Sequence, residues 1–267
     1  MNQIIFTDLD GTLLDTETYS YEKSLAAINR LKQKNIPIIF CSAKTRAEQE
    51  IYRRKMEVFH PFIVENGGAI FIPANYFPFA FSYHKIADAL LVIELGTSYK
   101  EIRQLLDKVR EESNLCFRGF GDMSAEEVAK ESGLDIESAK LAKQREYDET
   151  IKFDISDEEV SKTLAKIKGI GLNWTHGGRF YDIMGDNDKG KAVTIVSNLY
   201  RKLWGEIETI GLGDSLNDLT MLSAVDIPVL VQKRNYTWEK TNLPRLRKIR
   251  GVGPEGWSRA IEEMIGV

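Results

Sequence analysis

Cysteine and histidine are scarce in this chain. Its 267 residues include two cysteines, Cys41 and Cys116, and three histidines, His60, His84 and His176. The cysteines have no paired spacing and the histidines form no pair at helical spacing. Neither a disulfide framework nor a zinc site built from these residues is therefore expected. If the protein is an enzyme, we expect carboxylates to carry its chemistry.

Long apolar segments are also missing. The longest candidate, Ala87 to Leu95, contains Asp88 and Glu94, whereas a helix that spans a bilayer needs about 20 apolar residues. The first residues, Met1 to Asp8, lack the basic start and long apolar stretch of a signal peptide. We therefore expect a cytoplasmic protein that has no membrane partner.

An excess of charge of either sign is lacking too. The chain has 40 acidic and 36 basic residues, which gives a formal net charge of −4. Because surfaces that bind nucleic acid are usually strongly basic, no nucleic-acid partner is expected. The basic run 245–250 is interpreted as a solvated loop.

Hydrophobic residues make up 43% of the chain, which excludes general disorder. At about 150 residues per domain, the length fits one large domain or two modest ones.

Both ends of the chain alternate short apolar runs with helical patterns. In the N-terminal part, expected strands at 3–6, 36–40 and 62–64 alternate with expected helices at 20–34 and 46–56. In the C-terminal part, expected helices at 189–204, 215–224 and 255–265 alternate with expected strands at 207–212 and 227–231. This order predicts an α/β fold with a doubly wound, Rossmann-like parallel sheet. Its strands are continuously apolar because helices would cover both faces.

The middle of the chain has a different pattern. Strands are expected at 90–95, 115–120 and 150–155, and helices are expected to begin at the capping residues Ser98 and Ser124. We predict an inserted α+β domain over residues 84–174, and a core domain formed by residues 1–83 and 175–267.

The first polar cluster, Asp8-Leu9-Asp10-Gly11-Thr12, follows the first expected strand. On an extended backbone, two carboxylates two residues apart point the same way. One could attack an electrophile while the other handles protons, and together they could hold Mg²⁺. A calcium loop is a poor alternative, because the glycine is fourth instead of sixth, and a simple turn is a second alternative.

Three further clusters lie at strand ends or helix starts. Ser42-Ala43-Lys44-Thr45 could hold an anion with a hydroxyl and backbone N–H groups, or could be an ordinary N-cap. Lys189 lies at a helix start, where the dipole disfavours a cation, so it indicates an anionic partner unless it is a solvated surface lysine. The segment Gly211 to Asp218 carries two carboxylates without the Gly-Lys-Ser/Thr of a Walker loop, and its alternative is a capped helix.

Together these clusters resemble the haloacid dehalogenase (HAD) superfamily. The residues that match in order and spacing are Asp8, Asp10, Gly11, Thr12, Ser42, Lys189, Gly213, Asp214, Ser215, Asn217 and Asp218. The inserted domain falls between the second and third motifs, as in members that are mostly sugar and small-metabolite phosphatases. The resemblance implies a HAD core with an inserted cap domain that determines substrate specificity.

A closer resemblance is to the mannosyl-3-phosphoglycerate phosphatases. It rests on stretches at 6–15, 41–45, 65–67, 178–180 and 253–257, and the cap is its least specific part. It implies a Mg²⁺-dependent phosphatase that converts mannosyl-3-phosphoglycerate into mannosylglycerate and phosphate. Glucosyl-3-phosphoglycerate, sucrose phosphate or a hexose phosphate are alternative substrates. A phosphosugar mutase and a non-catalytic binding module are alternative functions on the same scaffold.

The resemblance also implies a role for each site residue. Asp8 attacks phosphorus and forms an aspartyl-phosphate, and Asp10 acts as general acid and then as general base. Mg²⁺ is bound by Asp8, Asp214 and Asp10, the last through its backbone carbonyl. Phosphate binding is assigned to Ser42, Ala43 and Lys189, and support of the site to Asn217 and Asp218.

A small anionic sugar phosphate is thus the expected partner. A phosphoglycerate also carries a carboxylate, which favours arginine forks, while residues at a strand end could bind sugar hydroxyls. The candidates for contact with the substrate are Lys44, Thr45, Glu65, Asn66, Arg145 and Arg179. A surface cation or an ion pair is the alternative for each basic residue.

Overall fold

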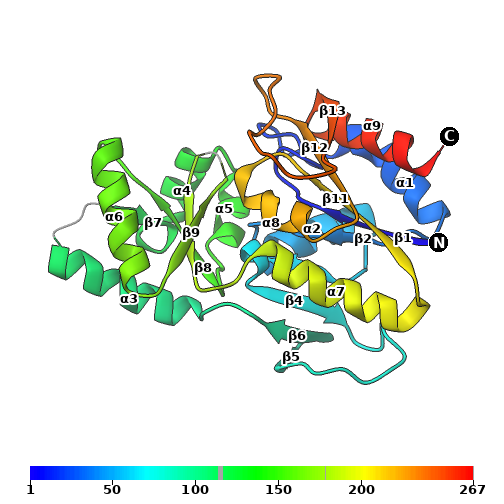
Figure 1. Ribbon diagram of the computed structural model, residues 1–267. Coiled ribbons are helices and arrows are strands. Elements are labelled where there is room, and N and C mark those ends of the chain that lie inside the picture. The colour runs from blue at the N-terminus through cyan, green and yellow to red at the C-terminus, as the bar shows by residue number, and fades with distance from the viewer. Residues whose placement is uncertain (114–116, 178, 267) are drawn as a thin grey trace.

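A parallel sheet forms the centre of the protein, in the strand order β13-β12-β11-β1-β2 (Figure 1). The structure is a computed structural model that describes residues 1–113, 117–177 and 179–266. The strands are β1 (Asn2–Thr7), β2 (Ile38–Phe40), β11 (Ile207–Gly213), β12 (Ile227–Gln232) and β13 (Arg247–Val252). Each neighbouring pair is parallel, which confirms the expected α/β fold.

Helices cover both faces of this sheet. They are α1 (Leu25–Gln33), α2 (Arg46–Met56), α7 (Lys189–Trp204), α8 (Leu219–Ser223) and α9 (Pro254–Ile265), and the short 3₁₀ turn η1 (Glu22–Ser24) precedes α1. Successive residues of β1 alternate between the faces: Ile5 packs with α1 and α9, whereas Ile4 and Phe6 pack with α7 and α8. Burial on both faces accounts for the continuously apolar strands.

A second sheet extends the first at the edge formed by β2. It has the order β3-β4-β6-β5 and consists of β3 (Phe62–Val64), β4 (Ala69–Pro73), β5 (Lys85–Ala87) and β6 (Leu90–Glu94). A parallel bridge between Cys41 and Ile63 joins the two sheets. Residues 84–94 were expected in the inserted domain, but we propose that they belong to the core, because β6 pairs with β4 along its whole length.

A third, antiparallel sheet stands apart from the other two and is coloured green in Figure 1. Its order is β7-β8-β10-β9, with β7 (Arg118–Gly119), β8 (Asp148–Lys152), β9 (Asn173–His176) and β10 (Tyr181–Met184). Helices α3 (Tyr99–Ser113) and α6 (Asp157–Gly169) share one apolar cluster with it. Helices α4 (Ala125–Ser132) and α5 (Ile136–Ala142) contribute to a separate apolar cluster.

The expected boundary between residues 174 and 175 falls inside β9, and β10 also pairs with β8. We therefore propose that the insertion comprises residues 97–186. Both strands are short, and β9 carries few apolar residues, so their sequences gave a weak strand signal. Residues 114–116, which include Cys116 and the start of the strand expected at 115–120, lie outside the described residues, as does Gly178.

The basic run was also misinterpreted. Residues 247–252 form β13, which pairs with β12 at the edge of the parallel sheet. Only Ile249 of its first four residues is buried, and Arg247, Lys248 and Arg250 face solvent. A basic edge strand of this kind resists pairing with other chains, which explains its composition.

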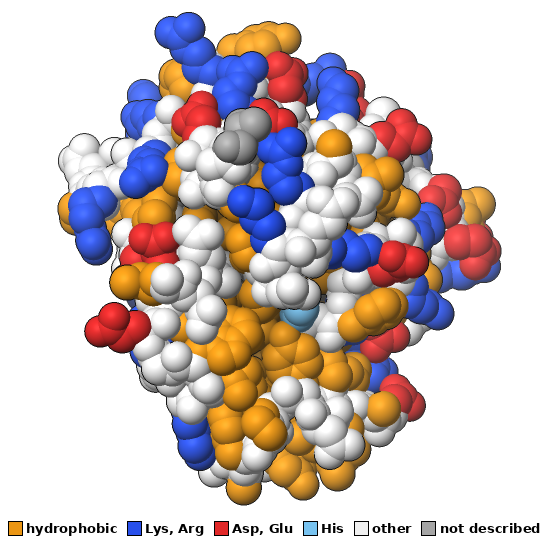
Figure 2. All heavy atoms as spheres, turned by 90° about the vertical axis from the view of Figure 1, so that its right-hand side faces the viewer, with side chains coloured by type: hydrophobic (Ala, Val, Ile, Leu, Met, Phe, Trp, Pro, Cys, Tyr) orange, Lys and Arg blue, Asp and Glu red, His pale blue; other side chains and the backbone are white. Residues whose placement is uncertain are grey.

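Hydrophobic side chains gather over the lower half of the face shown in Figure 2. The segment between β4 and β5, at the lower right of Figure 1, contributes the partly buried Tyr76, Phe79 and Phe81, which pack against the cluster around α7. Among the described residues, the helices all fall short of the length and apolarity that a membrane crossing would need.

Candidate active site

A cavity lies at the carboxyl ends of β1, β2 and β11, between the parallel sheet and the insertion. This is the position at which open parallel sheets bind ligands. It brings together residues that are far apart in the sequence. The predicted site residues that line it are Asp8, Asp10, Ser42, Ala43, Lys44, Arg145, Asp214 and Asn217.

Asp8 lies at the floor of this cavity. Its backbone N–H donates to the carbonyl of Leu212 at 2.9 Å, directly after the last paired residue of β1. The Lys189 ammonium lies 2.7 Å from one carboxylate oxygen of Asp8 and 2.7 Å from one of Asp218. Burial raises the pKa of Asp8 and Lys189 opposes that shift. The lysine at the start of α7 is thus a buried counter-ion, not a solvated surface residue.

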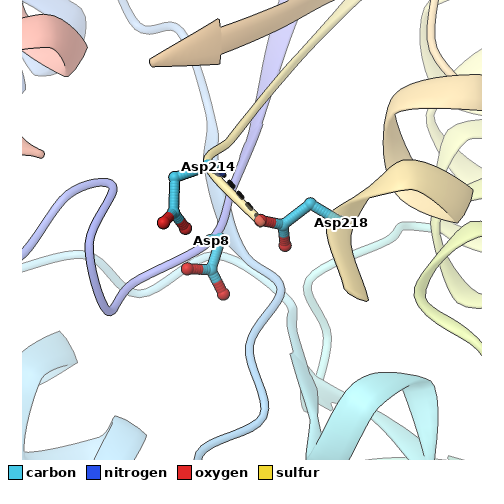
Figure 3. Close-up of side chains that lie close together, drawn as sticks. All are labelled: Asp8, Asp214 and Asp218. Atoms are coloured by element: carbon cyan, nitrogen blue, oxygen red, sulfur yellow. Dashed lines mark hydrogen bonds between the residues drawn. The ribbon is translucent and has the colours of Figure 1, made fainter. Parts of the chain in front are cut away.

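Three carboxylates converge beside this lysine (Figure 3). Asp8, Asp214 and Asp218 each offer an oxygen atom, and these atoms lie within 4.8 Å of one another. One oxygen of Asp218 accepts the backbone N–H groups of Asp214 and Ser215, at 2.9 and 3.0 Å, and the other faces Lys189. The Asp218 carboxylate is therefore engaged by protein donors, which leaves Asp8 and Asp214 as the better ligands for a cation.

Asp214 supports the same conclusion. Burial, and then the charge of Asp218, raise its pKa to about 7. Its oxygens accept hydroxyl groups from Ser215 at 2.8 Å and from Thr12 at 3.4 Å. A hard divalent cation prefers oxygen ligands and would offset the surplus negative charge, so the donor set fits Mg²⁺.

Asp10 has a different partner. Its carboxylate lies 3.0 Å from the Lys44 ammonium, which also contacts Glu48 at 3.2 Å. The other oxygen, Oδ1, is a buried atom that has no hydrogen-bond partner among the described residues. Burial raises the pKa of Asp10 and Lys44 opposes that shift. Gly11 adopts φ +78°, a left-handed conformation that turns the chain out of the sheet directly after Asp10.

The second cluster contains an N-cap residue and two residues of the cavity wall. Ser42 is 1% exposed and lines the cavity with Ala43. Thr45 is the N-cap of α2 in a capping box with Glu48, and its hydroxyl also contacts the carbonyl of Leu141 in the insertion at 3.0 Å. The structure therefore confirms the N-cap interpretation for Thr45, and it places Ser42 and Ala43 where an anion could reach them.

The two candidate arginines lie in different places. Arg145 is nearly buried, lines the cavity, and contacts the Asp148 carboxylate and the carbonyl of Ala43. Its Nε atom is buried without a partner in the described part of the chain. Arg179 is exposed, and it donates to the hydroxyl of Tyr19 at 3.3 Å. Of the two, Arg145 is therefore the better placed to meet a ligand in the cavity.

Glu65 follows β3 in the short 3₁₀ turn η2 (Glu65–Gly67), is fully buried, and points into the insertion. Its carboxylate accepts the backbone N–H groups of Glu146, Tyr147 and Asp148 at 3.0, 2.6 and 3.0 Å. Burial raises its pKa to about 7, against the opposing effect of Arg145. The expected contact of Glu65 with sugar hydroxyls is thus replaced by a bond between core and insertion.

Asn66 has a similar position. Its amide donates to Asp182 at 3.0 Å and to Asp148 at 3.3 Å, and its oxygen accepts from Asn217 at 3.2 Å. Two strands of the insertion, β8 and β10, are thereby tied to the core. Asn66 therefore acts behind the cavity wall, where it connects Asn217 to the insertion.

The variant Glu65→Gln tests this assignment. It should lower the free energy of unfolding by about 1–3 kcal/mol, because the charged acceptor becomes a neutral amide whose NH₂ would face the N–H of Glu146. Urea unfolding at pH 8 measures the loss, with the exposed Glu101→Gln on α3 as the matched control. Unchanged stability together with a raised KM would contradict it and indicate a contact with the substrate.

Several cavity residues escaped the sequence analysis. They are Tyr19 and Glu48 from the core, and Phe120, Thr150, Phe180 and Asp182 from the insertion. Glu48 had a signal, because Thr45-x-x-Glu48 is a capping-box sequence. The others reach the cavity only through tertiary packing, and local sequence carries no signal for them.

Comparisons with known proteins show the family of this chain. The family model for haloacid dehalogenase-like hydrolases matches residues 5–239. A glucosyl-3-phosphoglycerate/mannosyl-3-phosphoglycerate phosphatase from Methanococcoides burtonii is 51% identical, over 100% of this chain and 98% of its own. A mannosyl-3-phosphoglycerate phosphatase from Pyrococcus furiosus is 42% identical, over 86% of this chain and 91% of its own.

Solved structures share the fold at much lower identity. A haloacid dehalogenase-like hydrolase from B. subtilis has a TM-score of 0.69 and 15% identity, with 98% of this chain and 99% of that chain covered. A superfamily member from Bacteroides thetaiotaomicron has the same TM-score and identity, with 98% and 95% covered. The similarity therefore includes the insertion as well as the parallel sheet.

Proposed function

Because the chain belongs to the haloacid dehalogenase-like hydrolases, we propose that it is a Mg²⁺-dependent phosphatase of glycosyl-3-phosphoglycerates. The observation that carries the proposal is the buried group formed by Asp8, Lys189, Asp214 and Asp218 at the floor of a cavity. The names of the relatives include both mannosyl and glucosyl substrates. Both are proposed substrates here, and the product would be the glycosylglycerate.

The proposed nucleophile is Asp8. A phosphate monoester is a dianion and repels a carboxylate, so the site must offset charge and hold the groups in line. The Lys189 ammonium, 2.7 Å from Asp8, supplies a fixed positive charge. The hydroxyl of Ser42 and the backbone N–H of Ala43 would bind phosphoryl oxygens. A bond then forms from an Asp8 oxygen to phosphorus as the bond to the leaving alkoxide breaks.

The proposed acid and base is Asp10. A raised pKa helps it to keep the proton that the leaving alkoxide needs. Lys44 holds one of its oxygens, and the unpartnered Oδ1 stays available for the reacting groups. In the second step the ionised Asp10 takes a proton from water, which attacks phosphorus and releases phosphate from Asp8.

Mg²⁺ would be held by Asp8, Asp214 and the backbone carbonyl of Asp10. When bound, it would neutralise charge on the phosphoryl oxygens and orient the group for in-line transfer. Asp218 fixes Lys189 and the backbone of Asp214, and Asn217 contacts Asn66 behind the cavity wall.

Recognition of the glycerate carboxylate is proposed for Arg145. It is the described arginine that lines the cavity, and its planar fork suits a carboxylate. Lys44 also lines the cavity, but its ammonium is already shared by Asp10 and Glu48. Arg179 lies on the exposed side of Tyr19 and would contact a substrate only at the rim.

Phosphate release from a substrate panel tests the proposed function. We expect kcat/KM for mannosyl- and glucosyl-3-phosphoglycerate to exceed that for sucrose phosphate and hexose phosphates by at least about tenfold, because only the former present a carboxylate to Arg145. EDTA should abolish phosphate release and added Mg²⁺ should restore it.

Equal rates across the substrate panel would overturn the proposed substrate class. Release only with an added sugar acceptor would indicate a mutase, and no release from any phosphate monoester would indicate a binding module.

A further inference from the structure

The sequence 253–257, Gly-Pro-Glu-Gly-Trp, has no role in the mechanism above, yet it lies next to the site. It begins helix α9, with Pro254 in the first turn and Gly253 at φ +52°. A Cβ at Gly253 would lie 3.5 Å from the carbonyl oxygen of Gly11, in the turn that follows Asp10. The last helix therefore starts against the loop that carries both catalytic aspartates.

Trp257, the last residue of this sequence, is fully buried and contacts Thr7, the residue before Asp8. Its indole N–H donates to the Thr7 hydroxyl at 2.9 Å. The Thr7 hydroxyl donates in turn to the carbonyl oxygen of Asp8 at 2.7 Å. Two buried hydrogen bonds thus connect the final helix to the backbone of the proposed nucleophile.

The order of these bonds has a geometric consequence. A threonine hydroxyl has one proton and two acceptor lone pairs. Because the Trp257 N–H takes a lone pair, the single proton of Thr7 is directed to the carbonyl of Asp8. Without the indole N–H, the Thr7 hydroxyl would be free to rotate.

The carbonyl of Asp8 is held at a critical point of the chain. The pairing of β1 with β11 extends to Thr7 opposite Leu212, and the chain leaves the sheet at Gly11. The orientation of the peptide between Asp8 and Leu9 sets the path of the chain from Asp8 to Asp10. The sheet still holds the N–H of Asp8 through the carbonyl of Leu212, and the bond from Thr7 restrains the carbonyl side of the same residue.

The first turn of α9 is itself rigidly placed. A Cβ at Gly256 would lie 2.3 Å from the carbonyl oxygen of Gly251, so the two segments are in backbone contact. The N–H of Gly251 donates to the side chain of Gln232, at the end of β12, at 2.8 Å. Contacts with the central sheet thus fix the position of the Trp257 indole. It has little freedom to move with Thr7 if Thr7 is displaced.

We propose that Trp257 is a positioning residue for Asp8 and that it acts through the hydroxyl of Thr7. The inference rests on the proposed function, in which Asp8 is the nucleophile. Trp257 does not touch the reacting atoms. Its effect is on the attack by Asp8, so it should appear in kcat and leave KM almost unchanged.

The test uses Thr7→Val and Trp257→Phe, which remove the hydroxyl and the indole N–H while nearly preserving shape. Each should lower kcat by about tenfold, since small displacements of reacting groups carry costs of this order. Thr7→Ser restores the hydroxyl and should recover most of kcat. The double variant should be no slower than Thr7→Val alone, because both changes break the same connection.

Trp238→Phe is the matched control. Its indole N–H donates to the carbonyl of Ile249 at 3.2 Å, also in the C-terminal part of the chain, so the variant loses a comparable bond away from Asp8. It should lower the unfolding temperature to a similar degree and leave kcat unchanged. All rates are measured at least about 15 °C below the unfolding temperature of the least stable variant, so that each variant is folded in the assay.

Two results would overturn the proposal. One is an unchanged kcat in folded Thr7→Val and Trp257→Phe, and the other is an equal fall of kcat in Trp238→Phe. Rates are taken with p-nitrophenyl phosphate as well as with the glycosyl-3-phosphoglycerates. If the wild type hydrolyses p-nitrophenyl phosphate but not the glycosyl-3-phosphoglycerates, the proposed substrate class is contradicted. If kcat is unchanged in the variants with both kinds of substrate, the role of Trp257 is contradicted.

Discussion

Asp8→Asn should lose phosphate release by at least about a thousandfold while the protein stays folded, because removal of a nucleophile costs far more than removal of a supporting contact. The amide keeps the shape of the side chain and can still accept a hydrogen bond from Lys189, which lies 2.7 Å from Asp8. It cannot form the aspartyl-phosphate. Phosphate release with saturating Mg²⁺ measures the effect.

The same variant should not be less stable than the wild type in the absence of metal. Burial and the charges of Asp214 and Asp218 raise the pKa of Asp8, although Lys189 opposes them. A neutral amide removes that penalty, so the unfolding temperature at pH 8 should stay equal or rise. Asp107→Asn, an exposed residue of α3, is the matched control for activity. Residual release above about a hundredth of the wild-type rate would contradict a nucleophilic role.

Lys189→Met should combine a large loss of activity with a large loss of stability. The ammonium is 1% exposed and is shared by Asp8 and Asp218. Its removal leaves two buried carboxylates without their counter-ion, which costs about 3–5 kcal/mol. The developing charge on phosphorus also loses its fixed cation, so we expect kcat to fall at least about a hundredfold. Urea unfolding and phosphate release at pH 8 measure the two effects.

A second substitution separates these effects. The double variant Lys189→Met/Asp218→Asn removes one of the unpaired charges while an amide oxygen can still accept the N–H groups of Asp214 and Ser215, so part of the stability should return. Activity should not return, because the cation at Asp8 is still missing. Recovery of both quantities together would argue that Lys189 acts only through stability.

Much of the parallel core could be predicted because its signals are local. A polar, helix-prone segment predicted α2 at 46–56 and an apolar stripe at helical spacing predicted α7 at 189–204, and both bounds agree with the structure. The strands around the site are buried on both faces and so read as continuous apolar runs. Of the strands that were missed, β5, β9 and β13 are edge strands, at least partly solvated, and their sequences resemble loops, whereas β4 and β10 lie inside their sheets.

Some residues of the site could be predicted from local sequence and others could not. Asp8, Ser42 and Asp214 follow buried strands, so topology alone brings them to one edge of the sheet. The partners of Glu65 lie 81 to 83 residues away, and they are backbone N–H groups, which any sequence provides. Its role in joining the insertion to the core therefore leaves no pattern in the local sequence.

The pairing of β1 with the last elements has a consequence for biosynthesis. Asp8 and Asp10 leave the ribosome near the start of translation, but β11 pairs with β1 about 200 residues later, and the Trp257–Thr7 bond joins residues 250 positions apart. Chains elongate at about 5–20 residues per second, so the nascent chain carries the two proposed catalytic aspartates for on the order of ten seconds or more before β11 can join their sheet. During that interval the apolar β1 can pair with β2 but lacks β11, so one of its edges is open to pairing with other chains.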